Sequence, residues 1–175
     1  PAEPGICAQE AELSQSRFTP EGFELGVGRQ LPPLKVRTQS GALVTVGGTI
    51  DRVDVYRSPG GKEYVRVIDY KTGNKVFQLS DVLYGLNMQM LVYLAALVEA
   101  GDDLPAGVLY LPAAEPSVSV DRGAGPQAVK KAADRQMRMN GVVLEDTEII
   151  EAMEAGAKGT FIPASLNKDG TPSKS

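Results

Sequence analysis

Two stretches of the chain, residues 43–56 and 63–71, alternate apolar and polar side chains in the way that is typical of half-buried strands. The segment Ser58-Pro59-Gly60-Gly61 lies between them and supplies residues that favour a tight turn. The pattern therefore predicts an antiparallel hairpin.

The register of this hairpin decides which side chains meet. We expect a hairpin that is symmetric about Gly60, in which the facing pairs are Val55 with Val65, Val53 with Val67, and Asp51 with Asp69. Because side chains in a strand alternate between the two faces, all six share one face with Lys71. Two directly opposed carboxylates repel each other, so this face predicts a divalent metal held by Asp51 and Asp69. The alternative is a carboxylate pair neutralised by Lys71 alone.

The other face of the hairpin serves as a comparison. The same register places Asp54 across from Arg66, where the two form an ordinary cross-strand ion pair. We expect this pair to be a solvated surface bridge that contributes little to stability.

Helical spacing of apolar residues predicts a helix from Ser80 or Asp81 to about residue 100, where Gly101 ends it. The pattern then predicts a buried strand over 106–111 and a helix over 127–139. It next predicts a turn at Asn140-Gly141, an extended segment over 142–144, and a capped helix from Asp146 or Thr147 to Met153. Residues 1–40 predict an irregular lead-in with one edge strand, and residues 167–175 predict a flexible tail. The whole indicates one α/β domain with a mixed sheet flanked by helices.

Composition narrows the chemistry. The chain of 175 residues has no histidine, which excludes Ser-His-Asp and Cys-His catalysis and leaves oxygen atoms as the main metal ligands. Its single cysteine, Cys7, cannot form an internal disulfide.

No long apolar run or leader pattern is evident, so we expect a soluble, cytoplasmic protein without membrane association. The net charge of −4 does not by itself suggest a nucleic-acid partner.

Three motifs in order resemble those of a known family: Gly48-Thr49-Ile50-Asp51-Arg52-Val53-Asp54, Ile68-Asp69-Tyr70-Lys71-Thr72-Gly73, and Gln89-x-x-x-Tyr93. They resemble the PD-(D/E)xK nucleases of the RecB type, which have the restriction-endonuclease-like fold. Residues 137–146 and 168–171 narrow the resemblance to the nuclease domain of the B subunits of the AddAB (RexAB) helicase-nucleases. The resemblance covers most of the chain.

The resemblance implies a metal-dependent exodeoxyribonuclease domain that processes double-strand DNA ends for repair and recombination. Asp51, Asp69 and the main-chain carbonyl of Tyr70 would bind Mg²⁺ or Mn²⁺. Lys71 would orient or help deprotonate the attacking water and offset charge on the scissile phosphate. Gln89 and Tyr93, which are four residues apart, would support the metal site from one face of a helix.

The resemblance also implies partners, and it implies that this chain lacks parts of the family's full subunit. A helicase would deliver a single DNA strand, and the helicase-nuclease A subunit would be the protein partner. B subunits of this kind bind an iron–sulfur cluster through four cysteines, so we expect this chain to be a fragment that holds no cluster. Many relatives add a His or Glu from an upstream helix as a further metal ligand, but this chain has no His and offers upstream only weakly placed acids such as Glu10, Glu12, Glu21 and Glu24. The competing interpretation is therefore a catalytically inert module with a structural or protein-binding role.

Overall fold

The computed structural model describes residues 4–72, 88–113, 123 and 125–173. Its elements, in chain order, are α1 (Pro4–Gln15), β1 (Thr19–Val27), β2 (Leu34–Arg37), β3 (Leu43–Val46), β4 (Gly48–Arg57), β5 (Glu63–Lys71), α3 (Gln89–Ala100), β6 (Leu104–Pro112), α4 (Pro126–Met137), β7 (Asn140–Val143) and α5 (Thr147–Met153). Within these ranges no helix is long and apolar enough to span a membrane.

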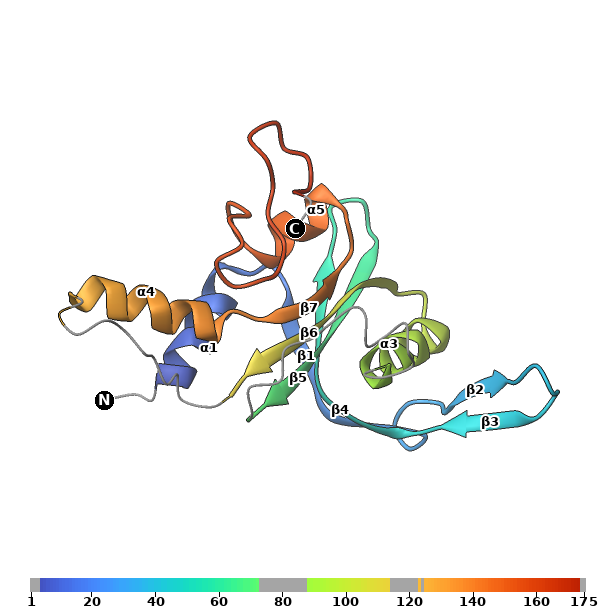
Figure 1. Cartoon of the computed structure of the whole chain (residues 1–175). Helices are drawn as coiled ribbons and strands as arrows, with labels where there is room; N and C mark the ends of the chain where they lie inside the picture. The colour runs from blue at the N-terminus through green and yellow to red at the C-terminus, as the bar shows by residue number, and fades with distance from the viewer. Residues whose placement is uncertain (1–3, 73–87, 114–122, 124, 174–175) are drawn as a thin grey trace.

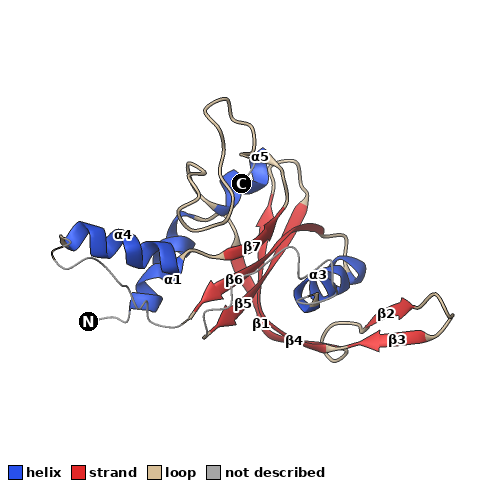
Figure 2. Cartoon of the chain, in the orientation of Figure 1, coloured by secondary structure: helices blue, strands red, loops and turns tan. Residues whose placement is uncertain are grey.

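Five strands form one mixed sheet in the order β1-β4-β5-β6-β7. Strands β5 and β6 are parallel, and every other neighbouring pair is antiparallel. Helix α3 covers one face of the sheet, whereas α1, α4 and α5 lie on the other side (Figures 1 and 2). The predicted α/β fold with a mixed sheet flanked by helices is confirmed. Strands β2 and β3 form a separate two-stranded hairpin that projects from the body.

Each face of the sheet packs into its own apolar core. Beneath α3, the inward valines of β4 and β5 contact Met90, Tyr93 and Leu97 of the helix. On the other face, Ile68 and Leu109 pack against α5 and the segment that contains Ile162. Because both faces are covered, even the polar side chains in the middle of β4 and β5 are removed from solvent.

Several elements agree with the sequence pattern. Strand β6 and helices α4 and α5 begin and end within two residues of their predicted bounds. Asp146 caps α5 as predicted, because its carboxylate accepts a hydrogen bond from the Ile149 backbone N–H at 3.2 Å. The predicted helix before Gly101 is present from Gln89 onward, and its predicted first turns lie outside the described residues.

Two expectations are wrong. Residues 1–40 are not an irregular lead-in, since they contain α1, β1 and β2, although β1 is indeed an edge strand. Asn140-Gly141 is not a turn but the start of β7, paired with Tyr110 and Leu109 of β6. A Cβ on Gly141 would lie 2.1 Å from the Val108 carbonyl oxygen, so glycine is needed here for close strand approach.

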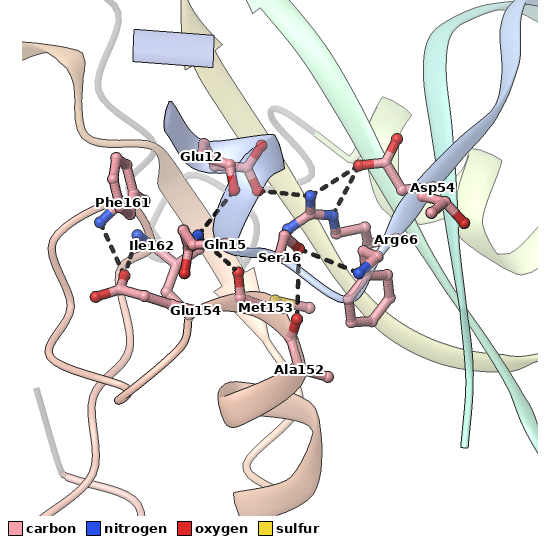
Figure 3. A network of polar contacts seen from close by, with 12 residues as sticks. Glu12, Gln15, Ser16, Asp54, Arg66, Ala152, Met153, Glu154, Phe161 and Ile162 are labelled. Carbon is pink, nitrogen blue, oxygen red and sulfur yellow. Dashed lines mark hydrogen bonds and ion pairs between the residues drawn. The ribbon is translucent and has the colours of Figure 1, made fainter. Parts of the chain in front are cut away.

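A third correction concerns the reverse face of the hairpin, where Asp54 and Arg66 are fully buried and not solvated. The Asp54 carboxylate accepts hydrogen bonds from Arg52 at 2.6 Å and from Arg66 at 2.9 Å. Arg66 also donates to Glu12 of α1 at 2.7 Å (Figure 3). The prediction failed because one hairpin cannot reveal that α1 covers its polar face. We call Glu12, Arg52, Asp54 and Arg66 the buried charge cluster.

Candidate active site

The β4–β5 hairpin has the register predicted from its sequence. Val53 pairs with Val67 and Val55 with Val65. The connecting turn is closed by hydrogen bonds from the Ser58 N–H to the Lys62 carbonyl at 2.8 Å and from the Gly61 N–H to the Ser58 carbonyl at 3.0 Å. The four valines lie in the core beneath α3, so this face is the one that leads to the predicted carboxylates.

Asp51 lies where this regular pairing ends. The last pair of the ladder is Arg52 with Ile68, one step short of the expected pair of Asp51 with Asp69. The Asp51 carboxylate instead crosses to β5 and accepts a hydrogen bond from the Tyr70 backbone N–H at 2.9 Å. Asp51 is thereby held beside the peptide that follows Asp69, although it does not continue the ladder.

The strict alternation of faces also breaks here. Ile50 and Val53 are three residues apart, yet both belong to the core beneath α3. Opposite them, the pairing of β1 with β4 skips Glu24, whose φ of 49° is unusual for a residue other than glycine. The alternation of faces is therefore interrupted between Ile50 and Arg52, beside Asp51. Local irregularity turns the Asp51 carboxylate toward β5, and irregular strand positions of this kind occur often beside active sites.

Asp69 and Lys71 form an ion pair at the end of β5. The Lys71 Nζ lies 2.5 Å from Asp69 Oδ2. This Oδ2 is nevertheless buried without a partner that has hydrogen-bond geometry. An ion pair needs proximity alone, whereas a hydrogen bond also needs alignment, so Lys71 neutralises Asp69 without a well-aligned hydrogen bond. A metal bound at Asp69 would share this carboxylate with Lys71.

Tyr110 of β6 is a neighbour of this pair that the sequence did not reveal. It pairs with Asp69 in the parallel β5–β6 register, and its ring centroid lies 5.2 Å from the Lys71 Nζ. Burial, together with the nearby charge of Asp69, raises the pKa of the Tyr110 hydroxyl. No signal in the sequence indicates which residue of β6 lies beside Asp69, because the connection between β5 and β6 does not fix their register.

Gln89 and Tyr93 share one face of α3, as their spacing predicts. The Gln89 side-chain amide donates to the Tyr93 hydroxyl at 2.5 Å. Tyr93 is buried, and its hydroxyl lies against the backbone of Gly48, three residues before Asp51. The pair thus reaches the beginning of β4.

Replacing Gly48 with alanine tests this contact. The added Cβ would lie 1.8 Å from the Tyr93 hydroxyl oxygen, so we expect the free energy of unfolding to fall by about 1–3 kcal/mol in urea titrations. Adding Tyr93→Phe should recover part of this loss by removing the clashing atom. Gly60→Ala, in the open β4–β5 turn, is the control. A loss that Tyr93→Phe leaves unchanged would show that the hydroxyl is not what excludes a side chain at Gly48, because phenylalanine keeps the ring Cζ that lies 2.7 Å from the added Cβ.

The groups that could hold a metal are the carboxylates of Asp51 and Asp69 and the Tyr70 carbonyl. Hard divalent cations prefer oxygen ligands, and Mg²⁺ usually keeps several waters, so two carboxylates and a carbonyl fit such an ion. The chemistry of the donor set, which is three oxygen groups on adjacent strands, is what favours this fit. No group of three acidic, histidine or cysteine side chains suited to a metal occurs among residues 4–72, 88–113 and 125–173. Glu12 is bound to Arg66 and Glu21 to Arg57, so neither supplies a further ligand.

Comparison with known proteins identifies the family of the chain. Residues 4–167 match the PD-(D/E)XK nuclease superfamily. The chain belongs to this superfamily. Within it, Asp51 on β4 and Asp69-Tyr70-Lys71 on β5 stand in the order that the motif describes, an acid followed by D-x-K.

Curated relatives narrow the comparison. Over 171 residues the chain is 41% identical to the B subunit of the ATP-dependent helicase/deoxyribonuclease from Thermoanaerobacter sp. strain X514, a match that covers 93% of this chain and 15% of the relative. It is 38% identical over 172 residues to the protein of the same name from Acetivibrio thermocellus, with the same coverage. The Symbiobacterium thermophilum counterpart is 40% identical over 163 residues, with 88% and 14% covered. This PD-(D/E)XK domain thus spans about 15% of the length of the relatives it matches.

Proposed function

We propose that this chain is a metal-dependent exodeoxyribonuclease domain that hydrolyses DNA phosphodiester bonds during the processing of double-strand ends. The observation that carries the proposal is the meeting of Asp51, the Tyr70 peptide, Asp69 and Lys71 at the ends of two neighbouring strands. Membership of a nuclease superfamily and relatives named as helicase/deoxyribonuclease subunits support it.

In this proposal each residue has a defined task. Asp51, Asp69 and the Tyr70 carbonyl bind Mg²⁺ or Mn²⁺, which when bound lowers the pKa of the attacking water and polarises the phosphoryl oxygen. Asp51 is held in place by the Tyr70 N–H. Lys71 lies beside Asp69 at the end of β5. We assign it to orienting or helping to deprotonate the attacking water and to offsetting charge on the phosphate.

The proposal extends to partners. The relatives are named as B subunits of an ATP-dependent helicase/deoxyribonuclease, a name that couples helicase and deoxyribonuclease in one enzyme. We propose that helicase parts outside this chain deliver a DNA strand to it, and that the A subunit of the helicase-nuclease is its protein partner. No iron–sulfur cluster is assigned to this chain.

An inert module of the same fold is the second candidate. Two observations favour it: Lys71 already neutralises Asp69, and the described residues supply no third acidic ligand. In that case the domain would serve as a structural or protein-binding part of a repair complex. The two candidates differ in whether the folded protein binds a divalent metal at Asp69.

Thermal unfolding with added Mn²⁺ separates them. A ligand that binds only the folded state at about 100 times its Kd adds about 2.7 kcal/mol of stability, which for a chain of this size raises Tm by about 5–10 °C. We expect such a rise in the wild type and its loss in Asp69→Asn. Asp102→Asn, at the opposite end of β6, is the control and should keep the rise. An equal rise in wild type and Asp69→Asn, or none at millimolar metal, would favour the inert module.

A further inference from the structure

The β2–β3 hairpin and the turn that precedes it carry positive charge without any acid. We call residues 26–47 the arm. Between Glu24 and Asp51 the sequence contains Arg29, Lys35 and Arg37 and no aspartate or glutamate, although the whole chain has a net charge of −4. All three side chains are exposed. The arm is therefore a cationic projection on an acidic domain.

Within the described residues these three cations have no carboxylate partner, unlike the arginines of β4 and β5. Arg57 forms ion pairs with Glu21 and Glu63, and Arg52 and Arg66 belong to the buried charge cluster. None of the ion pairs in the described part of the chain includes an arm residue. The Arg37 side chain donates a hydrogen bond to the Gly41 carbonyl at 3.3 Å. The charges of the arm thus remain available to an external anion.

The arm is fixed to the strand that carries Asp51. At its base, Leu34 is buried and Val46 packs against the core beneath α3. Gly47 joins β3 directly to β4, and the rest of the hairpin extends away from the body (Figure 1). An anchored base means that the cations have a defined position relative to the candidate active site.

The cations also form an ordered series that leads away from Asp51. Arg29 lies on the turn after Gly26, which pairs with Thr49. Lys35 pairs with Thr45 and Arg37 with Leu43, six and eight residues before Asp51. At about 3.3 Å per residue, these two pairs lie about 20 and 26 Å from Asp51 if the strands run straight. The series therefore continues over several nucleotides of an extended strand.

One face of the arm suits a polyanion and the other does not. Lys35 and Arg37 share their face with Thr45 and Leu43 across the strand, so no like or opposite charge opposes them. The reverse face carries the exposed pair Val36 and Val44, whose contacts would be apolar and insensitive to salt. Charge complementarity selects the first face and a phosphate backbone as its partner.

We propose that the arm is a track that binds the phosphate backbone of a single DNA strand on its way to the candidate active site. This inference rests on the proposed nuclease function and adds to it a DNA-binding surface within the domain itself. Contacts to phosphates alone carry no sequence preference and release counterions, so binding through the arm is sequence-independent and weakens with salt.

The test compares two triple variants that remove equal charge. Arg29→Gln/Lys35→Gln/Arg37→Gln neutralises the arm, and Lys62→Gln/Lys158→Gln/Lys168→Gln neutralises three exposed lysines elsewhere. Binding of labelled oligothymidylate is measured in EDTA over a range of salt concentrations. Log K falls as log [salt] rises, and each lost phosphate contact makes this dependence shallower by about 0.7. The slope of the arm variant should therefore be about 2 smaller in magnitude than that of the wild type, and the slope of the control variant should change much less. Lys35→Gln alone should lose about 0.7.

Metal-dependent hydrolysis of bis(p-nitrophenyl) phosphate, which is too small to reach the arm, should be the same in wild type and arm variant. Equal salt slopes for wild type and arm variant, or equal losses in both triple variants, would overturn the track while leaving the nuclease proposal intact. Loss of small-substrate hydrolysis in the arm variant would also overturn it, because the arm would then act by shaping the site. A wild type that neither binds nor cleaves DNA would reject the proposed function and the track with it.

Discussion

Asp51→Asn is expected to lower the rate of metal-dependent DNA cleavage by about 1,000-fold while leaving the fold intact. A bound metal contributes several kcal/mol to the stabilisation of the transition state, and a loss of about 4 kcal/mol corresponds to a factor of about 1,000. Asparagine keeps a side-chain oxygen that can accept the Tyr70 N–H hydrogen bond now made by Asp51 Oδ2 at 2.9 Å. The variant therefore removes a negative metal ligand and preserves the contact between strands. Single-turnover cleavage of a labelled strand in Mn²⁺ and thermal unfolding in EDTA are the two measurements.

Asp51→Ala is the informative comparison for this prediction. It should lose cleavage to the same extent but should also lose about 1–3 kcal/mol of stability, because the Tyr70 N–H is left without its acceptor. Lys71→Ala should reduce cleavage while keeping the metal-dependent rise in Tm, since Lys71 is not assigned as a ligand. Undiminished cleavage by Asp51→Asn would show that this carboxylate does not hold the metal. Undiminished cleavage by Lys71→Ala would remove Lys71 from the mechanism.

The hairpin could be predicted from the sequence because its information is local. Alternating valines and a Pro-Gly-Gly turn fix the register, and the pairs of Val53 with Val67 and Asp54 with Arg66 followed directly. The Asp146 cap is local in the same sense. These features depend on residues within a few positions of one another, so neither the rest of the sheet nor the covering helices were needed to find them.

The features that could not be predicted depend on long-range packing. Tyr110 lies beside Asp69 through a parallel register, and only the folded sheet reveals this register. The turn of Asp51 toward β5 accompanies an irregularity at Glu24 of β1, which is far away in sequence. The weak amphipathic pattern of α1 concealed a helix that supplies Glu12 to the interior. In each case the missing information is which distant element covers a given strand position.

The buried charge cluster, whose pair of Asp54 and Arg66 was expected to lie in solvent, should have the largest effect on stability. Glu12, Arg52, Asp54 and Arg66 are each at most 3% exposed, and Asp54 accepts hydrogen bonds from both arginines. Burial alone lowers the pKa of Arg52, but hydrogen bonds with Asp54 and the charge of Glu12 outweigh it and raise the pKa. Arg52 therefore stays charged in the folded protein, and its compensation depends on Asp54 and Glu12.

Asp54→Asn should accordingly lower the free energy of unfolding by about 3–5 kcal/mol, because it leaves two buried guanidinium groups with one carboxylate between them. Urea titration measures this loss as a lower midpoint at unchanged slope. Glu63→Gln is the matched control, since it also removes a carboxylate bound to an arginine, but in a pair that is about half exposed. It should leave the midpoint nearly unchanged. Equal, small effects in both variants would mean that Arg52 and Arg66 can reach water when Asp54 is lost, and that α1 does not seal this face of the hairpin.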